Sequence, residues 1–143
     1  MNQQPLKLVI QSLQQDQQLL QQLSPLLQKQ YVLLSLRKSA ELELLNQQAT
    51  ALLTKVQHNH QQRLQAMREL QLPATEQGFS LLLQKLPQTI RNASADLLQM
   101  VQDHTELCQR LNQKNGELLA QQRRLLQRLL GQHDQQSYPQ LSF

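Results

Sequence analysis

Leucine recurs at every seventh position near the start of the chain. Because an α-helix has about 3.6 residues per turn, every seventh residue returns to nearly the same face. The series therefore predicts a long helix with one apolar stripe, which must be buried against another element. The stripe consists of Leu6, Leu13, Leu20, Leu27 and Leu34.

Pro25 lies inside this first stripe, with Leu20 and Leu27 keeping the seven-residue step on either side of it. We favour one continuous helix with a kink at the proline, since the phase does not change. The alternative is a new helix capped by Ser24, with Pro25 in its first turn.

A second seven-residue series occupies the last third of the chain and predicts another long helix. We expect that helix to open at Pro87, to reach Leu130 and to stop at Gly131, a length of roughly 65 Å at ~1.5 Å per residue. Its first core position reads Ile90, Leu97, His104, Leu111, Leu118 and Leu125, and its second core position reads Ser94, Val101, Cys108, Asn115, Gln122 and Leu129.

Between the two series the apolar phase shifts, and this shift marks the remaining elements. A turn is expected in Ser35 to Ser39, with Ser39 as the N-cap of a second helix. That helix should end near Leu72, where Pro73 stops it. A loop from Pro73 to Gly78 and a short helix from Phe79 to Leu86 should follow.

The composition supports an all-helical protein. Of 143 residues, 34 are Leu and 32 are Gln, both good helix formers, while β-branched and aromatic residues are scarce. We predict an all-α fold, an elongated antiparallel bundle of three long helices plus a short helix. Residues 1–131 should form the bundle domain and residues 132–143 a flexible C-terminal tail that carries Tyr138, Leu141 and Phe143.

The last helix combines polar core positions with surplus leucine. Asn115 and Gln122 occupy positions where an apolar side chain would pack best. They either fix the register of the bundle or indicate that this half of the helix faces a partner or solvent. Leu119, Leu126 and Leu130 widen the apolar strip beyond the needs of two neighbouring helices, which favours a binding surface for a further helix.

The sequence contains no evident catalytic or metal site, and we expect no cofactor. His58 and His60 are two residues apart and point to different sides of a helix. His104 and Cys108 share a face, but no anion hole accompanies them, so packing is the simpler interpretation. No signal peptide or membrane span is evident, which favours a cytoplasmic protein without stable membrane insertion.

Residues 111–119, with the sequence LNQKNGELL and followed by Gln121 and Gln122, resemble the best local signature of the FlgN family. Asn-Gly inside a helix is otherwise unfavourable, which makes the match informative. The layout is also similar, with a leucine pair at Leu52 and Leu53, an arginine at Arg63 and a tail tyrosine at Tyr138. The chain departs from the family in its Gln-rich first helices and in Pro139 after the tyrosine.

FlgN proteins are cytoplasmic chaperones of flagellar type III export. The resemblance implies that the clients are the hook-filament junction proteins FlgK and FlgL, bound through helical terminal segments and kept from assembling early. It also implies that Tyr138 docks on the export gate protein FlhA. The predicted client-binding residues are Leu111, Asn115, Leu118, Leu119, Gln122, Leu125, Leu126, Leu129 and Leu130.

Two other functions are compatible with the pattern. The stripes could bury against a second copy, which would make the protein a self-associating coiled-coil scaffold. The cluster of Arg123, Arg124 and Arg128 could contact a membrane surface or nucleic acid, although a net charge of +4 with scattered basic residues argues against nucleic acid.

Overall fold

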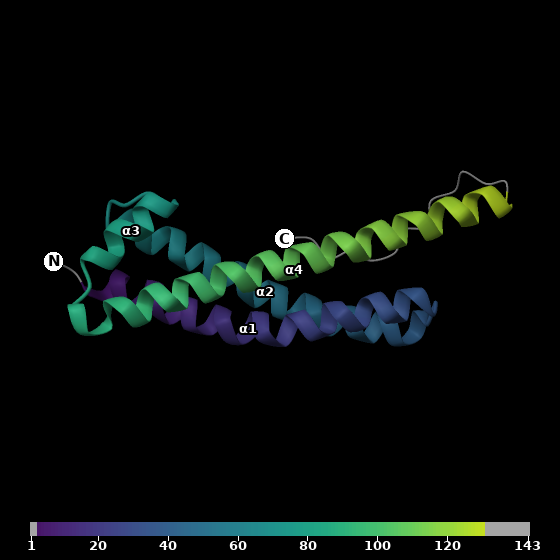
Figure 1. The fold of residues 1–143 in the computed structure, drawn as a ribbon, viewed down its shortest axis with the longest axis horizontal. Helices are drawn as coiled ribbons and strands as arrows, with labels where there is room; N and C mark the ends of the chain where they lie inside the picture. Colours follow the sequence, from purple (N-terminus) through teal and green to yellow (C-terminus); the bar gives the residue numbers. More distant parts are fainter. Residues whose placement is uncertain (1–2, 131–143) are drawn as a thin grey trace.

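A computed structural model describes residues 3–130, and these residues form four helices and no strand (Figure 1). This arrangement confirms the predicted all-α fold of three long helices and one short helix. The predicted stop at Gly131 and the predicted tail at residues 132–143 lie outside the described residues. The helices are α1 (Gln3–Ser35), α2 (Ser39–Glu69), α3 (Glu76–Gln84) and α4 (Gln88–Leu130).

Helix α1 lies between the other two long helices and packs against both. Contacts between α1 and α2 pair Asp16 with Asn59 and Gln30 with Asn46, so residue numbers fall on α2 as they rise on α1. Contacts between α1 and α4 instead keep a nearly constant separation of 85 to 88 residues. Helix α2 is therefore antiparallel to α1, and α4 is parallel to it.

Helix α1 runs unbroken through Pro25, as the favoured interpretation required, and no new helix starts at Ser24. Pro25 cannot donate a hydrogen bond to the carbonyl of Gln21. Both residues are exposed, so water can reach that carbonyl. The predicted leucine stripe is confirmed, since Leu13, Leu20, Leu27 and Leu34 are buried and Leu6 packs on the core.

The turn between α1 and α2 lies at the predicted residues, but Ser39 is not the N-cap of α2. Lys38 holds the N-cap position without a side-chain cap, and Ser39 is the first helical residue. Arg37 adopts a left-handed φ of 55°, its N–H donates to the Leu34 carbonyl, and the Lys38 N–H donates to the Leu33 carbonyl. These bonds form a Schellman motif, which ends α1 and satisfies its last carbonyls.

Helix α2 ends at Glu69 rather than Leu72, again with a Schellman motif. Gln71 has a φ of 59°, and its N–H and that of Leu72 donate to the carbonyls of Arg68 and Met67. Neither motif uses glycine, the residue that normally identifies it in a sequence.

Helix α3 begins at Glu76, three residues before its predicted start. Thr75 caps it, because its hydroxyl accepts a hydrogen bond from the Gly78 N–H. The prediction that Gly78 belongs to the loop is wrong. A Cβ atom at this position would lie 1.7 Å from the Pro73 carbonyl oxygen. Glycine therefore allows the backbone of Pro73 to lie against the first turn of α3.

Helix α4 starts directly after Pro87, close to the predicted start. The guanidinium of Arg91 donates to the carbonyls of Leu83, Gln84 and Leu86, which fastens the end of α3 to the first turns of α4. At the opposite end, α4 extends past the α1–α2 turn, so its last turns overhang the bundle (Figure 1).

Candidate functional site

The seam between α1 and α4 is built on polar side chains at seven-residue intervals. The thiol of Cys108 lies 3.9 Å from the Leu20 carbonyl oxygen. The amides of Asn115 and Gln122 donate to the carbonyls of Leu27 at 2.8 Å and Leu34 at 2.6 Å. Each contact joins residues 88 apart, so the three contacts fix one register of α4 on α1.

The heptad position that faces α1 most closely is therefore the second core position. Ser94, Val101, Cys108 and Asn115 are buried there, whereas Ile90, the start of the first series, is 45 % exposed. Leu125, at the other end of the first series, is 41 % exposed, so the first series is not the face that packs most closely on α1. Small and polar side chains allow α4 to approach the α1 backbone, and the larger residues flank this seam.

Asn115 also belongs to a buried chain of amides that crosses all three long helices. Its Nδ2 lies 2.6 Å from Oε1 of Gln30, and Nε2 of Gln30 donates to Oδ1 of Asn46 at 2.8 Å. Since these amides are buried, a shift in register would leave them without partners, at a cost of ~1–3 kcal/mol for each unmet group. The register-fixing interpretation of Asn115 fits this geometry.

A second polar layer crosses the bundle nearer its other end. The carboxylate of Asp16 is buried and accepts from Arg63 at 2.6 Å and from Asn59 at 2.9 Å. On the α4 side, Nδ1 of His104 lies 3.0 Å from Oε1 of Gln17. Together the two layers specify how α2 and α4 align with α1.

The structure gives His104 and Cys108 separate partners on α1. Burial raises the pKa of the Cys108 thiol to about 11. The thiol therefore stays protonated at neutral pH in the folded protein. In the unfolded chain it has the lower, ordinary pKa of a cysteine and ionises before the pH reaches 11. Its contribution to stability is complete below the unfolded pKa and falls as the pH rises toward 11.

The overhang begins where α1 ends. Gln122 contacts Leu34, the next-to-last residue of α1, and one heptad later Leu129 would need a partner at position 41. Residue 41 lies beyond the end of α1, in α2, and Leu129 is 73 % exposed. We call the exposed apolar side chains of this overhang the leucine ridge, which consists of Leu125, Leu126, Leu129 and Leu130.

The predicted client-binding residues divide between the bundle and the overhang. Asn115 and Leu119 are 3 % exposed, so the expectation that Asn115 faces a partner or solvent is wrong. Leu111 and Leu118 are half-buried at the flanks of the seam, and Gln122 is half-buried within it. The four members of the leucine ridge are exposed, and their role in client binding stays a prediction. Tyr138 lies outside the described residues.

A small cleft, which the sequence did not suggest, adjoins the leucine ridge. It has a volume of about 130 Å³, lies between the α1–α2 turn and α4, and is continuous with the ridge through Leu126. We call it the turn cleft, and its lining consists of Leu34, Arg37, Ser39, Leu42, Gln122, Arg123 and Leu126.

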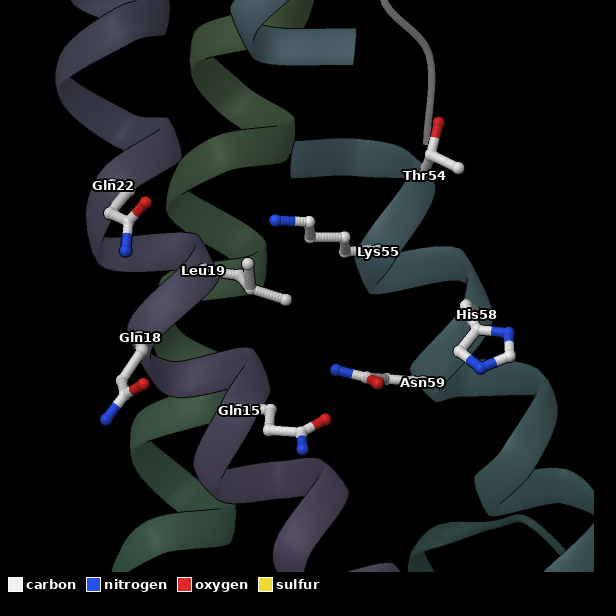
Figure 2. A pocket seen from close by; sticks show the side chains of 8 residues that line it. All are labelled: Gln15, Gln18, Leu19, Gln22, Thr54, Lys55, His58 and Asn59. Atoms are coloured by element: carbon white, nitrogen blue, oxygen red, sulfur yellow. The ribbon is translucent and has the colours of Figure 1, made fainter. Parts of the chain in front are cut away.

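A larger pocket of about 550 Å³ lies between α1 and α2, away from the ridge. Figure 2 shows Lys55 reaching from α2 toward α1, with Leu19 extending toward it and His58 turned away. The residues that line it with amide or hydroxyl groups are Gln15, Gln18, Gln22, Thr54 and Asn59. Among residues 3–130, no three His, Cys, Asp or Glu side chains cluster as a metal site would require.

No helix in the described part of the chain combines the length and apolarity needed to cross a membrane. The family model described as FlgN protein matches residues 2–138, nearly the whole chain. No curated protein and no solved structure matches this chain. With its helical bundle and its long final helix, the chain belongs to the FlgN family, and its general role is that of a flagellar export chaperone.

Proposed function

We propose that this protein acts in the cytoplasm and holds helical terminal segments of hook-filament junction proteins, FlgK-like and FlgL-like, on the leucine ridge. It binds without catalysis, prevents these clients from assembling early, and delivers them to the type III export gate protein FlhA. In this proposal the tail residue Tyr138 makes the gate contact.

The observation that carries the proposal is the exposure of four leucines where α4 extends beyond the end of α1, the helix against which it packs. Each buried leucine side chain contributes about 1.5–3 kcal/mol relative to an exposed one, so a client helix gains from covering the ridge. An amphipathic client helix presents apolar residues at the same spacing and fits such a surface. Ordering a flexible segment costs free energy, which limits the affinity and allows release.

The direct test replaces Leu125 and Leu129 together by Asp. Both side chains are exposed and neither lines the turn cleft, so the bundle should stay folded while client binding is lost. Co-purification with FlgK-like and FlgL-like proteins measures binding, and circular dichroism measures folding. The matched control is Leu81→Asp on α3, an exposed leucine at the other end of the molecule. Unchanged client binding by the double variant would refute the ridge assignment.

The tail is tested separately. Removal of residues 132–143, or Tyr138→Ala alone, should spare client binding and reduce export of the junction proteins. Normal export by both variants would refute the gate contact while leaving the ridge assignment intact.

A self-associating scaffold is the alternative that the same ridge permits, because a second copy could cover it. Sedimentation at micromolar concentration distinguishes the two functions. A tight dimer that dissociates on Leu125→Asp with Leu129→Asp and excludes junction proteins would favour the scaffold.

A further inference from the structure

The leucine ridge is bordered by arginines on both edges. At 100° per residue, Arg124 and Arg128 lie next to Leu125 on one side of α4, and Arg123 lies next to Leu130 on the other. Arg123 also lines the turn cleft, together with Arg37 from the α1–α2 turn. The apolar surface is therefore framed by guanidinium groups from two elements that are distant in sequence.

The charged residues that border the leucine ridge on α4 and line the turn cleft are arginines. Arg37, Arg124 and Arg128 form no ion pair with a carboxylate among residues 3–130. The part of α4 that follows Glu117 contains three arginines and no acidic residue up to Leu130. An occupant of the ridge consequently meets an apolar strip with positive edges.

We propose that the partner segment is an acidic amphipathic helix, whose apolar face covers the leucine ridge and whose flanking Asp or Glu side chains pair with Arg37, Arg124 and Arg128. This rests on the proposed client binding and specifies the charge of the segment that is recognised. In paired helices, charges that flank an apolar seam select the partner and its orientation in this way.

The apolar strip favours a helix over the other anionic partners. Nucleic acid binds basic residues through its phosphates and gains little from leucine side chains. A membrane surface would take up the leucines, but stable interfacial binding needs a larger apolar face together with several basic residues near the lipid. Four leucines with arginines on both edges match the width of one helix face.

The test uses two synthetic helical peptides with the same leucine face, one flanked by Glu and the other by Lys. Fluorescence anisotropy with the full-length protein should show the Glu peptide binding more tightly, by on the order of tenfold at about 50 mM salt, and the difference should shrink at about 500 mM. In Arg124→Glu with Arg128→Glu the preference should reverse toward the Lys peptide. The control is Arg110→Glu, an exposed arginine on α4 outside the overhang.

Equal binding of both peptides, binding of neither, or an unchanged preference in the charge-reversed protein would overturn the inference. So would duplex DNA or phosphatidylglycerol vesicles that bind at least as tightly as the Glu peptide and lose binding in the same variant. The proposed function is judged independently, because it predicts that Leu125→Asp with Leu129→Asp loses junction-protein binding whatever the charge preference.

Discussion

The bundled and overhanging segments of α4 continue one heptad pattern but have opposite surroundings. In the bundled segment, Cys108, Asn115 and Gln122 face α1 and contact its backbone carbonyls. In the overhang the next residue of this series, Leu129, is largely exposed. The polar residues of this series are thus buried or half-buried at the seam, whereas its apolar residue Leu129 is exposed. The point at which α1 ends, and not the hydrophobicity of each side chain, determines which residues of the series are buried.

The difference also separates two kinds of energy. The polar seam contributes little net stability, because each hydrogen bond replaces one to water, but it penalises every other register. Much of the apolar area of the leucine ridge stays exposed in the folded monomer, so burying it against a partner would be favourable. One helix therefore specifies the fold with polar groups and offers a surface with apolar groups.

Breaking a polar layer of the bundle should have the largest effect on stability. Asp16→Ala leaves the Arg63 guanidinium beside a buried site without its carboxylate and removes the acceptor of Asn59. We expect a loss of about 3 kcal/mol in the free energy of unfolding, measured by chemical denaturation. Asp96→Ala, at an exposed position on α4, is the control and should change stability by less than about 0.5 kcal/mol. Equal effects of the two variants would mean that the layer does not hold the bundle.

Removing the amide that fixes α4 should have the next largest effect. Asn115→Ala deletes the donor to the Leu27 carbonyl and leaves Oε1 of Gln30 without it. The expected loss is about 1–3 kcal/mol in thermal or chemical unfolding, because buried polar groups lose their partner. Asn92→Ala, exposed on the same helix, provides the control. A neutral result at Asn115 would refute its role in fixing the register.

The long elements were predictable from the sequence because their periodicity is strong. The leucine series of α1, the continuity through Pro25 and the start of α4 after Pro87 all follow from repeating apolar positions and proline geometry. The overhang also follows, because the last series is longer than the first and position 41 breaks the first series with Glu.

The remaining features depend on tertiary contacts or on conformations that the sequence does not reveal. Both Schellman motifs use Arg37 and Gln71 in place of glycine, so neither helix end carried its usual signal. The seam at Ser94 and Asn115 depends on which face meets α1, and small polar residues in a leucine-rich helix did not suggest the closest contact. The turn cleft brings Arg37 next to Arg123, and no local pattern links residues so far apart.

The smallest expected effect concerns Gly116, which lies in α4 just after the amide that fixes the register. A side chain there would meet no atom within 4 Å, so close packing does not require glycine. Gly116→Ala should raise the free energy of unfolding by roughly 0.5–1 kcal/mol, because alanine loses less conformational entropy on folding. Gly78→Ala is the contrasting variant and should destabilise the protein, since its Cβ would meet the Pro73 carbonyl.

If Gly116→Ala stabilises the bundle and leaves client binding unchanged, the ridge acts as a rigid continuation of the bundled segment. If it stabilises the bundle but weakens client binding, bending at Gly116 is part of how the overhang receives its partner. A loss of stability would show that α4 is not a regular helix at this point and would contradict the packing described above.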